Sequence, residues 1–333
     1  MASRIRLFSR AGTLIYEIDS PAYREWVLND IGNANFPVIA AGLEPYIEFG
    51  NYVLIEHDKL APWVGTIYTP RPWAPNTLIV NAKSAMTLFG LRVGSYQQLV
   101  TGSWGQVFSQ VIGIVNSAEQ TLLQIGTYDD GISYSSVVDM SNPYTYLQRA
   151  LIQARTRLDF RPVVTNGKLT VFVDMQPTLY TPSNLRLVEG MNIKDNTGTL
   201  IEQGEIYNDI TILGIGLDQI KFTARAVDPL SVEKYGLRQI LFSEGQSQAD
   251  VDRLAVVRLA QYAYPRKTLG LVTMDQEDNF LNIRVGNSGS VEFQTQGYRN
   301  GALGYKGTAG IRVIQFDDKT SEAVLVNEDI SNG

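Results

Sequence analysis

Residues 47–71 read IEFGNYVLIEHDKLAPWVGTIYTPR, and this stretch decides which fold the sequence favours. β-Branched and aromatic residues lie on both sides of a Gly-Asn pair, and a second run of the same kind covers 64–68, which is typical of strands. The chain's single histidine, His57, stands between Glu56 and Asp58. Successive side chains of a strand point to opposite faces, so these three do not converge without a further partner. We therefore expect a solvent-facing residue at a strand end; an acid/base role would need a partner far away in sequence.

Composition bounds the class of protein. The chain has 333 residues, of which 44% are hydrophobic, and this length suits about two globular domains. It contains no cysteine, which excludes disulfides, zinc sites of the cysteine type and thiol catalysis. The first residues, MASRIRLFSRAG, do not resemble a signal peptide, and no run of 18 apolar residues predicts a transmembrane helix. The net charge of -6 disfavours tight binding of nucleic acid.

The first third of the sequence reads as strands. Residues 4–8 and 14–18 flank the turn SRAG and predict an opening hairpin. Residues 22–28 fit either a short helix or a bulged strand, and the pattern does not separate the two. Short strands with Gly-rich turns return between 269 and 326, in a cadence typical of a barrel or sandwich.

Local signals predict an α/β segment between about 96 and 180. Ser103 is a suitable N-cap for a helix with one apolar face, and Asn142-Pro143 begins a second helix. Asn166-Gly167, between two alternating runs, is the strongest hairpin signal in the chain. Ser247, followed by Asp250, gives a capping-box-like start to a third helix, which comes after a further group of strands.

Two short segments echo each other. IEFGNYVLIE around Gly50 resembles IRVGNSGSVEF around Gly286. The match fits two copies of one β-barrel, and it also fits chance, since Gly-Asn is a common turn pair. If the segments are copies, both glycines should lie at equivalent turns with positive φ.

No motif predicts chemistry. One histidine cannot supply a His-rich metal site. The pairs Asp129-Asp130 and Asp317-Asp318 read as turns, and Asp275, Glu277 and Asp278 read as a solvated acidic turn. No phosphate loop or GxSxG motif occurs, and Gly214-Ile-Gly216 lacks the rest of a dinucleotide fingerprint.

The remaining candidates have structural explanations. Arg155 and Arg157 lie at the end of a predicted helix, where cations stabilise the helix dipole. Trp63, Trp73 and Tyr68 fit a packed barrel end or a subunit contact better than a sugar platform. We therefore predict no catalytic, cofactor-binding or metal residues, no cofactor and no enzymatic activity.

Several segments, taken in order, resemble the tail hub proteins of bacteriophages, also called baseplate hub or tail-tip proteins. They are REWVLNDIGNANFPV after the first hairpin, IEFGNYVLIE with PWVGTIYTPR, NAKSAMTLFGLRV, and KYGLRQ before the last helix. The order covers nearly the whole chain, with QTQGYRNGALGYKGTAG as the least similar part.

The resemblance implies a mainly β fold with an α+β insertion, two tail-tube-like β-barrel domains and small α/β domains. Residues 1–95 together with 184–240 would form the first barrel, 96–183 the α/β insertion, and 241–333 a helix followed by the second barrel. It further implies a homotrimeric ring in the virion tail, assembled in the host cytoplasm, through which DNA passes without specific binding. The ring would contact the tail tube or distal tail protein above, a spike or fibre protein below, and the tape measure protein as a further candidate, without stable membrane insertion.

Two other functional classes stay open on the sequence. One is a tail-associated polysaccharide or peptidoglycan hydrolase that uses two carboxylates, whose separation in space is not visible in the sequence. The other is a carbohydrate- or receptor-binding module, which needs an exposed aromatic groove. Contractile injection machines use similar hubs, so the resemblance covers both kinds of particle.

Overall fold

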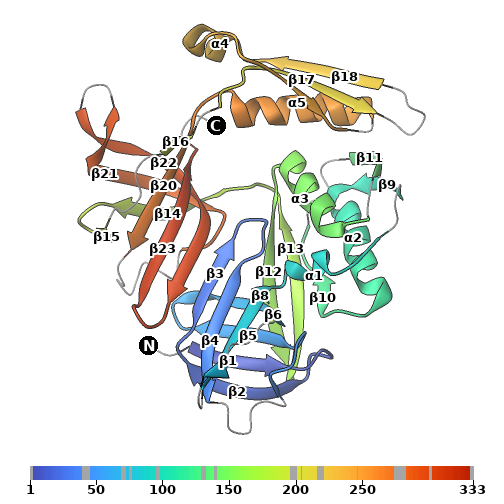
Figure 1. Ribbon diagram of the computed structural model, residues 1–333, viewed down its shortest axis with the longest axis vertical. Coiled ribbons are helices and arrows are strands. Elements are labelled where there is room, and N and C mark those ends of the chain that lie inside the picture. Colours follow the sequence, from blue (N-terminus) through green and yellow to red (C-terminus); the bar gives the residue numbers. More distant parts are fainter. Residues whose placement is uncertain are drawn as a thin grey trace.

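The structure is a computed structural model of the chain. It describes residues 3–39, 46–68, 73–74, 77–94, 98–128, 133–138, 141–195, 201–203, 205–215, 221–245, 247–273, 283–299 and 302–330. Four packed parts are visible in Figure 1: an N-terminal β unit, an α/β insertion beside it, a C-terminal β unit, and a small α/β unit at the opposite end from the N-terminal one. The fold is mainly β with α+β insertions, as predicted.

The N-terminal β unit is an antiparallel sheet with the order β3-β4-β8-β6-β5-β1-β2. Its strands are β1 (Ser3–Phe8), β2 (Leu14–Ser20), β3 (Tyr23–Val27), β4 (Asn33–Ile39), β5 (Tyr52–His57), β6 (Leu60–Tyr68), β7 (Trp73–Ala74) and β8 (Thr77–Ser84). The predicted opening hairpin is β1–β2, and the ambiguous segment 22–28 contains a strand, β3. Alternate residues such as Phe36, Val53 and Val80 fill its core, as expected for strands with one buried face.

The α/β insertion covers one face of this sheet. It contains α1 (Thr87–Gly90), β9 (Gln98–Ser103), α2 (Trp104–Ala118), β10 (Leu123–Ile125), β11 (Ser133–Val138), α3 (Pro143–Ala154), β12 (Arg157–Thr165) and β13 (Lys168–Gln176). Both predicted helices are confirmed with their caps, because Ser103 and Asn142 accept the expected backbone hydrogen bonds. The hairpin at Asn166-Gly167 joins β12 to β13. Phe8 and Leu54 of the β unit share one core with α2 and α3.

The C-terminal β unit consists of β14 (Thr181–Val188), β15 (Ile193–Asp195), β16 (Ile201–Gln203), β20 (Arg266–Thr273), β21 (Asn287–Arg299), β22 (Ala302–Asp317) and β23 (Glu322–Asp329). It joins the N-terminal unit through five antiparallel residue pairs between β22 and β3. The strands of the two β units thus form one 15-stranded sheet whose main path is open, from β15 to β2, rather than a closed ring.

The small α/β unit contains β17 (Asp209–Ile215), β18 (Lys221–Val227), α4 (Pro229–Tyr235), β19 (Gln239–Ser243) and α5 (Gln248–Tyr262). The sheet has the order β18-β17-β19, and α5, capped by Ser247 as predicted, covers one of its faces. Ile210 and Ile212 of the central strand are fully buried against this helix.

The pairing differs from the division that the resemblance implies for residues 184–240. We expected these strands to return to the N-terminal unit, but β14 pairs with β21, and β15 and β16 pair with β20. The strands β17 to β19 form a separate sheet. The helix α5, which we expected to open the second barrel domain, packs against that sheet instead. Alternation along a strand predicts a buried face but not the core to which that face contributes, and Leu187 packs with Val291 and Leu325 of the C-terminal unit.

The two β units share an order of five strands. In the N-terminal unit the spatial order is β3-β4-β8-β6-β5. In the C-terminal unit it is β15 or β16, followed by β20-β23-β22-β21. If the five strands of each unit are numbered along the chain, with β15 or β16 as the first, both spatial orders read 1-2-5-4-3. All these neighbours are antiparallel in both units. The sixth strand differs, because β1 runs antiparallel to β5 whereas β14 runs parallel to β21.

The two Gly-Asn turns lie at the same place in this shared order, directly before β5 and β21. The φ angles are +84° at Gly50 and +82° at Gly286, as expected for both glycines. The amide of Gly50 donates to Ile67 on β6 at 3.1 Å, and that of Gly286 donates to Ile311 on β22 at 2.9 Å. In each turn the following asparagine amide donates to the carbonyl three residues earlier. The strand order and these bonds support a duplicated five-strand unit.

Candidate functional site

His57 lies at the joint between the two β units rather than facing solvent. It ends β5, is partly buried, and its ring meets Phe316 of β22 edge-on with 5.5 Å between the ring centroids. Burial and the positive charge of Arg24 lower the pKa of His57. Glu56, its neighbour, points elsewhere and pairs with Arg6 at 2.5 Å. The expectation of a solvent-facing residue was wrong because Phe316, 259 positions away along the chain, covers the ring.

A buried ion pair forms the centre of this joint. Arg24 on β3 donates to Asp318, which follows β22, at 3.1 Å, and neither side chain is exposed to solvent. Arg24 also donates to the hydroxyl of Ser3 at 2.6 Å, and Asp318 accepts the backbone amide of Ala22 at 2.8 Å. Burial lowers the pKa of Arg24, against the opposing effect of the Asp318 carboxylate. Asp317-Asp318 is a turn, as predicted, but Asp318 has a structural role that the sequence did not indicate.

The structure does not describe the other acidic candidates. Asp129-Asp130 and the cluster of Asp275, Glu277 and Asp278 lie outside the described residues. Across the part of the chain that the structure describes, no group of three or more histidine and carboxylate side chains is arranged to hold a metal ion.

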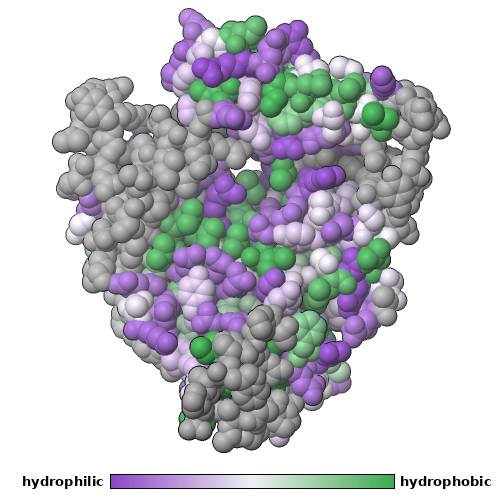
Figure 2. Space-filling view, viewed as in Figure 1, coloured by the Kyte–Doolittle hydropathy of each residue, from purple (hydrophilic) through white to green (hydrophobic). Residues whose placement is uncertain are grey.

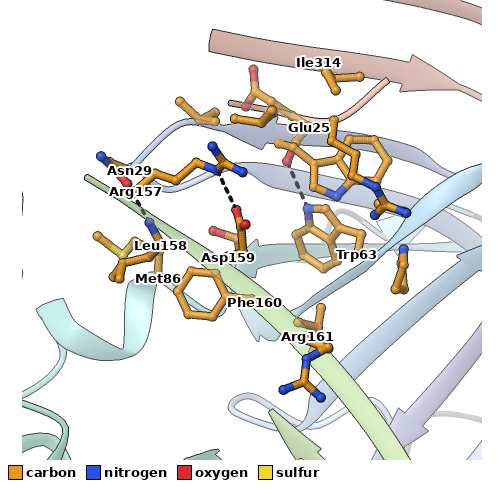
Figure 3. A pocket seen from close by; sticks show the side chains of 18 of the residues that line it. Glu25, Asn29, Trp63, Met86, Arg157, Leu158, Asp159, Phe160, Arg161 and Ile314 are labelled. Carbon is orange, nitrogen blue, oxygen red and sulfur yellow. Dashed lines mark hydrogen bonds and ion pairs between the residues drawn. The ribbon is translucent and has the colours of Figure 1, made fainter. Parts of the chain in front are cut away.

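A cleft of about 480 Å³ lies where β3, β6, β12 and the segment before β21 meet; we call it the interunit cleft. Figure 3 shows residues that line it. Figure 2 shows apolar surface near the middle of the face of the molecule that is seen in Figure 1. Its apolar wall includes Trp26, Trp63, Phe160, Ile283 and Ile314. Its volume lies within the range of roughly 300–1,000 Å³ that is usual for ligand pockets. It is therefore the candidate functional site of this chain.

Asn29 holds the insertion against the N-terminal unit at one end of the cleft (Figure 3). Its side-chain amide donates to the carbonyl of Thr156 at 2.9 Å, and its oxygen accepts the amide of Leu158 at 3.0 Å. The backbone of Asn29 has a φ of +55°, a conformation that asparagine tolerates better than most residues.

Arg157 ties the insertion to the C-terminal unit. It is the first residue of β12, is 6% exposed, and donates to the hydroxyl of Thr181 at 2.9 Å and to the carbonyl of Gly286 at 3.1 Å. Its Nε lies 3.3 Å from Asp159. The sequence placed Arg157 at a helix end, which is wrong, because α3 ends at Ala154. Only its tertiary partners, far away along the chain, reveal this role.

Two carboxylates on neighbouring strands of the cleft have opposite pKa shifts. Asp159 on β12 is directly opposite Asp174 on β13. Burial raises the pKa of Asp159 against the opposing charge of Arg157. Burial acts in the same direction on Asp174, but hydrogen bonds from Arg161 and Thr127 outweigh it and lower the pKa of that carboxyl. The cleft thus contains one carboxyl whose pKa is raised and one whose pKa is lowered.

The predicted aromatic corner is divided between core and surface. Trp63 is 2% exposed, and its indole nitrogen donates to the carbonyl of Glu25 at 2.9 Å (Figure 3). Tyr68 is 36% exposed, with the amine of Lys83 4.0 Å from its ring centroid. The side chain of Trp73 is outside the described residues. The burial of Trp63 weighs against a sugar platform at this corner and supports packing.

The fold is that of phage tail proteins. The tail protein from Neisseria meningitidis superposes with a TM-score of 0.65 at 10% identity, over 99% of this chain and 97% of that chain. The prophage tail protein gp18 from Listeria monocytogenes gives a TM-score of 0.64 at 9% identity, over 99% of this chain and 95% of that chain. A chain of the lidded Francisella PdpA–VgrG complex gives 0.56 at 14% identity, over 100% of this chain and 53% of that chain.

Identities this low show a shared fold and leave the function to be argued. No protein-family model matches the chain, and no curated protein matches its sequence. The implied fold of a phage tail protein is confirmed by the structural neighbours. Of the helices that the structure describes, none is both long and apolar enough to cross a membrane.

Proposed function

We propose that this chain is a structural hub of a phage tail tip or baseplate. The observation that carries the proposal is the fold, which is shared with phage tail proteins over 99% of the chain. Three copies would form a ring that continues the tail tube and connects it to a central spike or fibre. Two similar β units in each of three copies give six similar positions around the ring, which suits a six-fold tube above and a three-fold spike below.

The ring contacts the tail tube or a distal tail protein on one side and a spike or fibre protein on the other, with the tape measure protein as a further candidate. It belongs to the virion tail and assembles in the host cytoplasm. The net charge of -6 supports a channel that lets DNA pass without strong phosphate binding. In this proposal the chain has no enzymatic activity and no cofactor. The fold is also found in a chain of a PdpA–VgrG complex, so a contractile injection particle is included as a location.

The symmetry of the chain in its particle tests this proposal. Mass photometry of the purified protein should show a trimer, and averaged images of intact tails should show a three-fold ring at the end of the tail tube. A ring of six identical chains, or a stable monomer that is absent from the tail, would overturn it.

A second candidate function is a tail-associated hydrolase of polysaccharide. The observation that favours it is the pair Asp159 and Asp174, whose pKa values are shifted in opposite directions in one cleft, as general acid and nucleophile require. Against it, Asp174 already accepts bonds from Arg161 at 2.9 and 3.3 Å, so this carboxylate is not free to attack. We therefore favour the structural role.

Peptidoglycan turnover separates the two candidates. The wild-type protein should release no soluble fragments from labelled cell walls, and Asp159→Asn should behave in the same way. Release by the wild type that Asp159→Asn abolishes would favour the hydrolase.

A further inference from the structure

The two β units of the chain are joined through the edges of two strands. β3 pairs with the last part of β22, beginning with Val27 opposite Val313. This part of β22 lies beyond its pairing with β21, which ends at Gly310. Counted along the chain, β3 is the first of the five shared strands of its unit, and β22 is the fourth of its own. The chain therefore joins a first strand to a fourth strand.

The corresponding edges of the other first and fourth strands, β16 and β6, have no neighbouring strand in the part of the chain that the structure describes. β16 pairs there only with β20. β6 pairs with β8 as far as Tyr68, whereas its pairing with β5 ends at Thr66. The two strands lie in different units and do not pair with each other (Figure 1). One chain therefore has one unused edge of each kind.

The register of the shared strands shows which residue of β6 corresponds to the joined part of β22. Ile67 on β6 and Ile311 on β22 accept the amides of the two Gly-Asn turns, so they are equivalent. The next residue of β6 that pairs with β8 is Tyr68. The next residue of β22 that pairs with β23 is Val313, after a bulge at Arg312. Tyr68 is therefore the equivalent of Val313.

The same register relates β16 to β3. Asn33 on β4 and Thr268 on β20 occupy equivalent places, because each pairs with the residue that follows the partner of the equivalent isoleucine. The register of β3 on β4 puts Glu25 opposite Asn33, and β16 puts Ile201 opposite Thr268. β16 therefore has the place in the C-terminal unit that β3 has in the N-terminal unit.

Gln203 and Val27 each lie two residues beyond this position, so they are equivalent as well. Within the chain, Val27 lies directly opposite Val313. The amide of Leu28 donates to the carbonyl of the residue before Val313 at 2.8 Å, which is the pattern of an antiparallel pair that is not itself hydrogen-bonded. A second copy joined with the same geometry would place Gln203 opposite Tyr68.

Exposed aromatic side chains beside Tyr68 support a contact at this place. The ring centroids of Phe49 and Tyr68 are 6.0 Å apart, and the two residues are 43% and 36% exposed. Phe49 precedes Gly50 as Val285 precedes Gly286, and Val285 is half-buried in the segment that meets β3 at the interunit cleft. Aromatic residues are enriched in protein interfaces, so the equivalent joint between copies would cover the exposed pair.

We propose that the ring closes by the same joint used again between copies: β16 of one copy adds to the free edge of β6 in the next, with Gln203 opposite Tyr68. The inference rests on the proposed function, because a ring of copies is part of that proposal, and it names the surfaces through which the ring closes. Each copy offers one edge of each kind, so the contact runs head to tail and repeats until the ring closes. Main-chain hydrogen bonds between the two strands hold the copies together.

Engineered cysteines test this pairing directly, because the chain has no cysteine of its own. The full chain with Tyr68→Cys and Gln203→Cys, after oxidation, should give a covalent trimer on a denaturing gel that disappears on reduction. Cross-strand pairs of this kind have Cα atoms about 4.5 Å apart, within the range that disulfides span. Val27→Cys with Val313→Cys, the same pair within one chain, is the positive control and should give a disulfide-bonded monomer.

Two further controls define the register and the origin of the disulfide. Tyr68→Cys with Glu202→Cys should cross-link at least about tenfold less, because successive side chains of a strand point to opposite faces. An equimolar mixture of the single variants Tyr68→Cys and Gln203→Cys should give a disulfide-bonded dimer, whereas each variant alone should not. Only a bond between copies produces that dimer.

Substitutions at Phe49 provide a measurement that needs no cysteine. Phe49→Asp should raise the concentration required for half-maximal trimer formation by at least about tenfold, because it places a charge in the apolar contact. Phe49→Val, which introduces the residue type found at the equivalent position 285, should change that concentration by less than about threefold. Leu241→Asp, at a residue of the small α/β unit that is 59% exposed, should have no effect. Urea unfolding of the same variants separates a loss of assembly from a loss of folding.

The outcomes distinguish this joint from the proposed hub. A trimer that forms no disulfide between positions 68 and 203 would overturn the joint and leave the hub standing. Cross-linking of Gln203→Cys to Asp19→Cys on β2, the other end of the main path of the sheet, would also overturn it, because the ring would then close through a different edge. Disulfide-linked copies that extend into open filaments would support the joint and refute the trimeric hub. A monomer that forms no disulfide between copies would refute both.

Discussion

Replacing Gly286 by alanine should destabilise the protein strongly, for two reasons visible in the structure. The φ of +82° disfavours a residue with a Cβ atom by about 1–2 kcal/mol. The new Cβ atom would also lie 2.4 Å from Cδ of Arg157, which is too close, so the buried arginine would have to move. Its hydrogen bonds to Thr181 and to the carbonyl of residue 286 would then weaken, and bonds to charged groups contribute about 1.5–3 kcal/mol each. We expect a total loss of roughly 2–5 kcal/mol in the free energy of unfolding.

Two other glycines serve as matched controls. Gly50→Ala has the same backbone strain at a φ of +84°, but its Cβ atom would meet Nε of Arg10 at 3.1 Å, at the end of a flexible side chain. Gly167→Ala, with a φ of +73°, has no atom within 4 Å of the new Cβ atom. Both should cost only about 1–2 kcal/mol. Urea unfolding followed by tryptophan fluorescence measures all three variants, and a Gly286→Ala that is no worse than Gly50→Ala would refute the reasoning about Arg157.

Three further changes test the contacts between the parts of the chain. Arg24→Met should cost about 3–5 kcal/mol by leaving Asp318 buried and unpaired, and adding Asp318→Leu should recover most of that loss; a double variant as unstable as the single one would contradict this. Asn29→Gly, which keeps the positive φ accessible, should cost about 1–3 kcal/mol through its two lost hydrogen bonds, measured by urea unfolding. The pKa of His57 is lowered in the folded state, so its contribution to stability is complete above an unfolded pKa of about 6.5 and decreases as the pH falls below it. His57→Gln should therefore flatten the decrease in stability below about pH 6.5 while leaving assembly at neutral pH within tenfold of wild type, and an unchanged pH profile would contradict the assignment.

Local signals in the sequence predicted the elements of the insertion well. Ser103, Asn142 and the pair Asn166-Gly167 act through hydrogen bonds and backbone angles within a few residues, so a short window contains the whole cause. The same holds for the two Gly-Asn turns, where only the local φ had to be predicted.

The candidate site could not be predicted in the same way, because its residues come from segments that lie far apart along the chain. Arg157 looked like a helix-end cation, and its bond to the carbonyl of Gly286 joins residues 129 positions apart. The sequence predicts His57 as a solvent-facing residue at a strand end, but the ring of Phe316 packs edge-on against it. Apolar and polar residues alternate along the strands after residue 184, but this alternation does not specify which of the hydrophobic cores receives the buried face.

The difference between the two β units is as informative as their similarity. Five strands and the Gly-Asn turn recur, so two places in each chain offer a similar surface. The strands that flank the shared five, β1 and β14, do not match. β1 runs antiparallel to β5 and is covered by the α/β insertion through Phe8, whereas β14 runs parallel to β21. In the proposed trimer, a partner that touches only the shared strands would meet six similar positions, and a partner that touches the flanking strands would meet three. This arrangement supports the hub role that we propose, and under that proposal the tube contacts should lie on the shared strands and the spike contacts on the flanking strands.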